Sequence, residues 1–143
     1  MRNALIAQFA LLVGIWAVPV MGQDFDGSKP LLCVSMDIRE CNRGMACETR
    51  QAIDVNAPLF FRVNFAENRL DGRRADGTES TTAIERIENV DNKIILQGVD
   101  DGIEGVRDGL GWSLAIAMDS GRMVLTGAGD DVAFAIFGAC MTD

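Results

Sequence analysis

Four cysteines carry the clearest chemistry in this sequence, because thiolates either form disulfides or bind metals. They are Cys33, Cys41, Cys47 and Cys140. An even number of cysteines in a short exported chain is typical of disulfides, and four cysteines allow three pairings. A Cys41–Cys47 bridge would close a short loop, and Cys33–Cys140 would then join the first strand to the last. A four-cysteine metal site is the alternative, but C-x-x-C spacing is absent and the thiols would be oxidised outside the cytoplasm. We therefore predict two disulfides and no metal site, with the connectivity left open.

Acidic side chains are concentrated in the glycine-rich segment 99–111, which we interpret as a loop. They are Asp100, Asp101, Glu104 and Asp108. Calcium binds several carboxylate oxygens, so this segment is a candidate calcium site or acidic interaction loop. The loop pattern D-x-[DN]-x-[DN]-G is absent, which favours a solvated acidic loop.

Five arginines fall on neighbouring predicted strands and could together bind a carboxylate or a phosphate. They are Arg62, Arg69, Arg73, Arg74 and Arg86. The alternative, which we favour, is that each pairs with a nearby Asp or Glu on an adjacent strand.

The aromatic residues offer a second choice between a site and a structural role. Trp112 and the phenylalanines could line a cavity for an apolar ligand. In a small barrel such side chains more often fill the interior themselves, and this is the interpretation that we favour.

The sequence contains no histidine and no tyrosine. A Ser-His-Asp or Cys-His arrangement is therefore excluded within one chain, as are histidine-ligated metal sites. Lys29 lies near the expected mature amino terminus and Lys93 in an expected turn, so neither is placed to activate a serine. We expect a protein that is not an enzyme, with no catalytic residue and no cofactor.

Residues 1–22 have the order of a secretory signal peptide. Arg2 supplies a positive charge, an apolar run follows from residue 4 to residue 18, and Pro19 ends it. Cleavage after Gly22 would leave residues 23–143. The apolar run is shorter than the roughly 20 residues that a spanning helix needs. We expect a periplasmic or secreted protein.

Arg2 is the only charged side chain in residues 1–22, so the mature chain has 12 basic and 21 acidic side chains, a net charge of −9. A charge of this sign argues against binding to nucleic acid or to anionic membrane surfaces. A chain of this length suits one domain.

Short alternating apolar runs separated by turn residues dominate residues 31–143, and this pattern predicts strands. The clearest run alternates Trp112, Leu114, Ile116 and Met118 with smaller residues. The expected strands are residues 31–38, 58–65, 69–74, 81–90, 93–98, 112–118, 122–126 and 132–141. Residues 23–30 are expected to be a flexible leader, and residues 39–48 a cysteine-containing loop.

Short turns between these strands indicate antiparallel neighbours. We therefore predict an all-β domain, residues 31–143, with an antiparallel meander of about seven to eight strands. Such a meander protects its edges by closing into a small barrel or half-barrel.

Several short motifs occur in this part of the chain. They are Cys33, Glu40-Cys41, Gly44 and Cys47, and residues 58–65, 94–98, 111–116, 121–126 and 137–140. In these motifs the chain resembles a family of small, uncharacterised exported proteins from proteobacteria, over most of residues 31–141. The resemblance implies export and a compact domain, and it implies no activity. Residues 103–110 look like an insertion relative to that pattern.

These observations favour a non-enzymatic periplasmic module that binds an unknown protein or small ligand. One alternative is an accessory subunit of a membrane-bound complex, which requires residues 1–22 to be retained as an anchor. The other is a hydrolase that uses carboxylates alone, which needs a paired geometry that sequence does not reveal.

Overall fold

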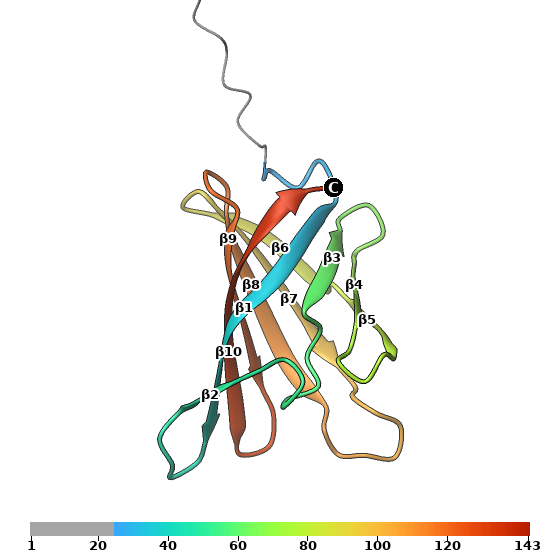
Figure 1. The fold of residues 1–143 in the computed structure, drawn as a ribbon. Coiled ribbons are helices and arrows are strands. Elements are labelled where there is room, and N and C mark those ends of the chain that lie inside the picture. The colour runs from blue at the N-terminus through green and yellow to red at the C-terminus, as the bar shows by residue number, and fades with distance from the viewer. Residues whose placement is uncertain (1–24) are drawn as a thin grey trace, which may run out of the picture.

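The computed structural model describes residues 25–143, so the predicted signal peptide lies outside the described residues. Ten strands make up the described part of the chain (Figure 1). They are β1 (Leu31–Asn42), β2 (Glu48–Arg50), β3 (Phe60–Asn64), β4 (Arg69–Arg73), β5 (Glu79–Ala83), β6 (Arg86–Val90), β7 (Lys93–Asp100), β8 (Leu110–Ala117), β9 (Arg122–Ala128) and β10 (Val132–Thr142). None of the described residues belongs to a helix, and so no long apolar helix that could cross a membrane is found among them.

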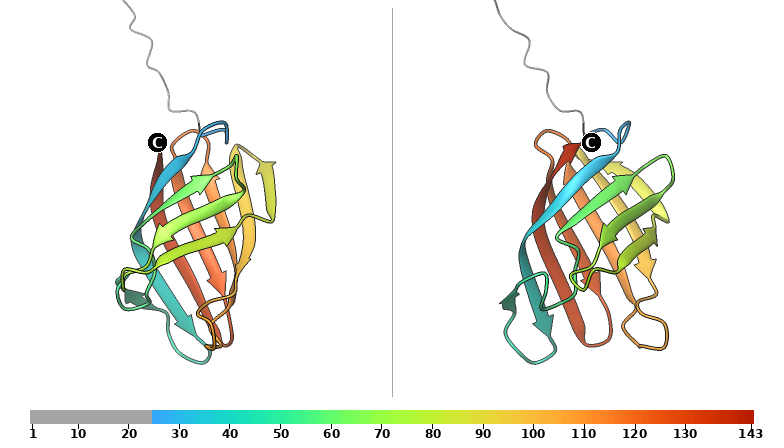
Figure 2. Two further views of the ribbon diagram at one scale, coloured as in Figure 1. Left: turned by 90° about the vertical axis from the view of Figure 1, so that its right-hand side faces the viewer. Right: turned by 45° about the vertical axis from the view of Figure 1, so that its right-hand side comes forward.

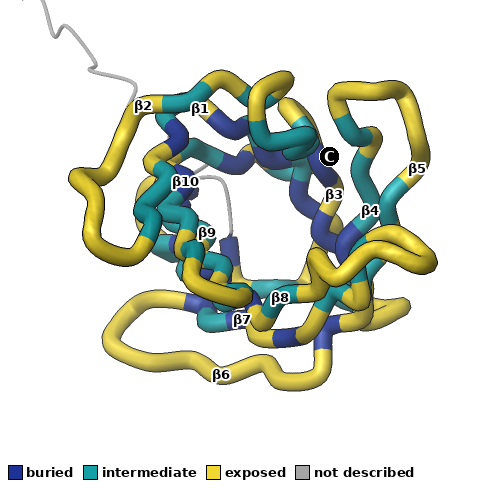
Figure 3. The backbone as a smooth tube through the Cα atoms, turned by 90° about the horizontal axis from the view of Figure 1, so that it is seen from below, coloured by how far each residue is buried: buried dark blue, intermediate teal, exposed yellow. Residues whose placement is uncertain are grey.

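The strands form one antiparallel sheet that curls into a half-barrel, as the predicted fold class required (Figure 2). The strand order is β5-β4-β3-β1-β10-β9-β8-β7-β6, and the short β2 pairs with β1 outside this path. The sheet thus has nine strands in its main path, slightly more than the seven or eight predicted. Seen from below, the strands lie around a common axis (Figure 3).

The extra strand arises because the expected strand 81–90 is interrupted. Ile84 and Glu85 separate β5 from β6, so one half of the segment pairs with β4 and the other with β7. Consecutive strands therefore occupy the two edges of the half-barrel. The Glu85 N–H donates to the Gln97 carbonyl oxygen at 2.8 Å, and the Thr82 hydroxyl donates to the Val99 carbonyl oxygen at 2.7 Å. These two bonds hold the end of β5 and the two residues that follow it against β7, and we call this contact the β5–β7 seam.

The core lies in the half of the half-barrel nearer the carboxyl terminus. Inward-facing residues on β7 and β8 are almost completely buried there, as the alternating pattern predicts. The largest fully buried side chains are Leu31, Val63, Ile94, Leu96, Leu114, Ile116 and Met123.

Both disulfides form, and the structure decides their pairing. Cys33 and Cys140 lie directly opposite each other on β1 and β10, and their bridge spans 107 residues of sequence. Cys41 and Cys47 close the β1–β2 loop over six residues. The first and last strands are therefore neighbours, which the half-barrel requires.

Further segments also differ from the sequence-based expectation, and β2 was not predicted. The first strand continues to Asn42, so only part of the expected loop 39–48 is irregular, because Ile38 to Asn42 pair with β10. The expected leader is not free at Phe25, whose side chain is 4% exposed and belongs to the core. Pro30 is also held, since its carbonyl oxygen accepts the Asp143 N–H at 3.1 Å.

Candidate functional site

A cavity of about 360 Å³ opens at the end of the half-barrel farthest from the carboxyl terminus, the lower end in Figure 1. It lies between the ends of β4, β7 and β9, the beginnings of β3, β5, β8 and β10, and the loop that precedes β3. The interior is therefore filled in one half and hollow in the other. At this end Phe61, Trp112 and Phe134 line a cavity, which is the alternative to the favoured expectation that the aromatic side chains fill the interior.

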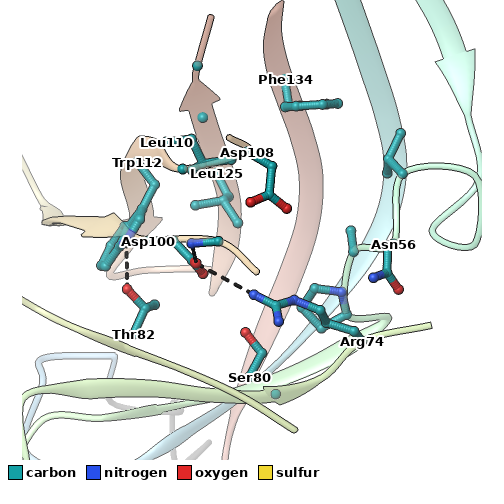
Figure 4. Close-up of a pocket in the computed structure, with 18 of the residues that line it drawn as sticks. Asn56, Arg74, Ser80, Thr82, Asp100, Asp108, Leu110, Trp112, Leu125 and Phe134 are labelled. Atoms are coloured by element: carbon teal, nitrogen blue, oxygen red, sulfur yellow. Dashed lines mark hydrogen bonds and ion pairs between the residues drawn. The ribbon is translucent and has the colours of Figure 1, made fainter. Parts of the chain in front are cut away.

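Most of the cavity wall is apolar (Figure 4). The large apolar side chains that line it are Phe61, Leu70, Leu110, Trp112, Leu125, Phe134 and Ile136. Short residues occupy other lining positions, among them Ser80 on β5 and Gly127 on β9. Their side chains are too small to fill the interior as the larger Leu114 and Ile116 do in the core, so space remains between the strands.

Trp112 forms part of both the cavity wall and the β5–β7 seam. Its side chain is 7% exposed, and its Nε1–H donates to the Thr82 hydroxyl at 3.1 Å. Thr82 in turn donates to β7, so the indole is held in one orientation by the seam. Gly98 leaves room for this ring, because a Cβ there would overlap both the ring and the Ala83 carbonyl oxygen.

One ion pair lies at the side of the cavity. Arg74 Nη2 is 3.5 Å from Asp100 Oδ1, and the two side chains are only 20% and 24% exposed. Asp100 Oδ1 also accepts the Gly102 N–H at 2.8 Å, which orients the carboxylate. The Arg74 N–H donates to the Thr78 carbonyl oxygen, and the Arg74 carbonyl oxygen accepts the Gly77 N–H, so the backbone of Arg74 is fixed in the β4–β5 turn. The pair is therefore placed before any ligand enters.

The acidic segment does not form a calcium site. Across residues 25–143 no group of three or more Asp, Glu, Cys or His side chains is arranged to hold a metal ion. The expected loop 99–111 is shorter than predicted, because Asp100 ends β7 and Leu110 begins β8. Asp100 and Asp108 instead accept backbone N–H groups of the loop between these strands, those of Gly102 and Ile103. The loop is a rim of the cavity, because Asp100, Ile103 and Asp108 all line it.

The five arginines do not converge on one anion site either. Each forms a salt bridge with a carboxylate, but only the Arg73–Glu79 bridge joins adjacent strands, so the favoured cross-strand pairing holds for one of the five. The partners are Asp143 for Arg62, Glu67 and Asp71 for Arg69, Glu79 for Arg73, Asp100 for Arg74 and Glu88 for Arg86. Of these five, only Arg74 lines the cavity.

The loop that precedes β3 is tied to the β4–β5 turn by Asn56 and Asp76. The Asn56 amide donates to Asp76 Oδ2 at 3.0 Å, and the Asp76 N–H donates to Asn56 Oδ1 at 3.1 Å. Asp76 also accepts the Thr78 hydroxyl and N–H. These bonds, first of all the Thr78 hydroxyl, hold the pKa of Asp76 below its ordinary value of 3.8.

Asp76→Asn is expected to remove part of the acid sensitivity of the protein. Because the folded-state pKa of Asp76 is lowered, its stabilising effect is present above pH 3.8 and is lost as the pH falls through the folded value. The melting temperatures of the wild type and Asp76→Asn should therefore differ near neutral pH and converge as the pH falls below 3.8 through the folded value. Asp119→Asn, at an exposed turn position, controls for loss of one charge. A constant gap between wild type and Asp76→Asn would contradict the assignment.

Sequence reasoning named Trp112, Arg74, Asp100 and Asp108 without placing them in one site. The alternation of apolar residues does not predict that the end of β4 lies near the end of β7, because this proximity depends on the β5–β7 seam. Comparison of the chain with protein-family models, with curated proteins and with solved structures gives no match.

Proposed function

We propose that this protein is a non-enzymatic, exported binding protein that holds one small, mainly apolar molecule in the cavity. The cavity itself carries the proposal. Its volume of about 360 Å³ falls within the range of small-molecule sites, and such sites combine apolar walls with a few polar groups. The two disulfides are typical of an oxidising environment outside the cytoplasm, and residues 1–22 support export to the periplasm or beyond.

The arrangement of the wall supports an apolar ligand over a polar one. Phe61, Leu110, Leu125 and Phe134 offer apolar surface to the cavity, and covering that surface with an apolar molecule removes it from water. Thr82 and Thr126 also line the cavity, but their hydroxyls already donate to carbonyl oxygens of the sheet. A strongly polar ligand would find few free partners on these walls.

Filling the cavity should abolish this binding. Leu125→Trp places an indole where an apolar probe would lie, so the affinity for N-phenyl-1-naphthylamine, an uncharged aromatic probe, should fall about tenfold or more. Probe fluorescence in a titration measures this affinity. The matched control is Val124→Trp, on the neighbouring position of β9 that faces away from the core.

Equal affinities for the wild type and Leu125→Trp would contradict the cavity as the binding site. The wild type failing to bind the probe would contradict the proposed function as a whole. Thermal melts of both variants show that each one folds, so that a loss of affinity is assigned to the cavity.

A further inference from the structure

The Arg74–Asp100 pair determines which end group the ligand can carry. A guanidinium has five N–H donors, and within residues 25–143 Arg74 side-chain donors make one bond, the 3.5 Å contact with Asp100. No fully buried side-chain nitrogen or oxygen in this part of the chain lacks a partner. The remaining donors of Arg74 are therefore accessible, on a residue that lines the cavity (Figure 4).

The charges around Arg74 disfavour an ionised end group of either sign. An anionic group that reached Arg74 would lie beside Asp100 and would face the rim carboxylate of Asp108. A cationic group that reached Asp100 would be repelled by Arg74. Bringing either ion into a mainly apolar cavity also costs its hydration, and the charge of the ion pair is already balanced.

An uncharged acceptor avoids both penalties. A ketone, ester or amide oxygen can accept an N–H of Arg74 while the guanidinium keeps its contact with Asp100. The hydrogen bond is charge-assisted, and such bonds contribute more than neutral ones. On the basis of the proposed function, we infer that the ligand is an uncharged molecule with an apolar body and a carbonyl-type oxygen that Arg74 recognises.

Four probes with the same chain length test the inference: octane, 2-octanone, octanoate and octylammonium. Each is titrated at neutral pH against the full protein loaded with N-phenyl-1-naphthylamine, and probe displacement gives the affinity. We expect 2-octanone to bind about tenfold more tightly than octane, because a hydrogen bond to a charged group is gained. Octanoate and octylammonium should both bind more weakly than 2-octanone.

The variant Arg74→Ala should lower the affinity for 2-octanone about tenfold and leave the affinity for octane unchanged. Arg73→Ala is the matched control, since it removes the same charge from the adjacent residue, which is exposed and pairs with Glu79. It should bind all four probes as the wild type does.

Three results would overturn the inference while leaving the proposed function intact. They are tightest binding of octanoate, tightest binding of octylammonium, and equal affinity of octane and 2-octanone for the wild type. Equal loss of 2-octanone affinity in Arg73→Ala and Arg74→Ala would also overturn it, because the effect would then be one of net charge. Failure of the wild type to bind the naphthylamine probe would instead contradict the proposed function.

Discussion

Replacing Cys33 and Cys140 together with alanine is expected to lower the free energy of unfolding by about 4–5 kcal/mol. The bridge closes a loop of 107 residues, so its loss releases most of the chain in the unfolded state. Both cysteines are also buried between β1 and β10, where the sheet depends on their register. Urea unfolding followed by circular dichroism measures the change.

The second disulfide supplies the control for this prediction. Cys41→Ala with Cys47→Ala removes a bridge over only six residues, at exposed or half-exposed positions. The entropic model predicts a smaller loss, about 2 kcal/mol. Equal losses in the two double variants would show that loop length does not govern the stabilisation. No loss in either variant would show that the bridges are irrelevant to stability.

Gly98→Ala is expected to destabilise the protein by about 3 kcal/mol and to open the β5–β7 seam. A Cβ at this position would overlap the Ala83 carbonyl oxygen and the Trp112 ring, and the backbone atom cannot move without β5. The Trp112 bond to Thr82 and the Glu85 bond to Gln97 should weaken together, because both cross the same seam.

Hydrogen exchange at the Glu85 amide measures the opening directly, and thermal unfolding measures the stability. Gly111→Ala is the control, because a Cβ there would meet nothing within 4 Å and Gly111 lies next to Trp112 on β8. If Gly98→Ala keeps both wild-type stability and slow Glu85 exchange, the seam does not depend on the close approach at Gly98. Faster Glu85 exchange in Gly111→Ala as well would also count against this explanation.

Local signals were sufficient for some strands and turns, such as β8 and the turn between β6 and β7. Alternation along residues 112–118 predicted an inward face that is buried in β8 at Trp112, Leu114 and Ile116. The turn at Asp91-Asn92 has positive φ at both residues, 49° and 57°, as expected for a tight hairpin. These features depend on neighbouring residues alone, and a sequence displays its neighbours directly.

The candidate site could not be predicted in the same way, because its residues come together only when the sheet curls. Arg74 and Asp100 are 26 residues apart, and nothing in their spacing selects Asp100 over the other acidic side chains. The expected continuous strand 81–90 also concealed the break at Ile84 and Glu85, since the bend there depends on which strands lie on each side.

The sequence by itself determined the all-β class, the antiparallel order of neighbouring strands and the presence of two disulfides. Periodicity, turn residues and an even cysteine count are local or compositional properties. Each of them predicts one of these features without knowledge of which distant residues are in contact. Only the tertiary structure decided which cysteines pair, which arginine lines a cavity and which half of the interior is hollow. The pairing of Cys33 with Cys140 depends on β1 lying beside β10 in the sheet. The hollow end and its arginine depend on the strands that meet there when the sheet curls, where short residues such as Ser80 and Gly127 line the cavity.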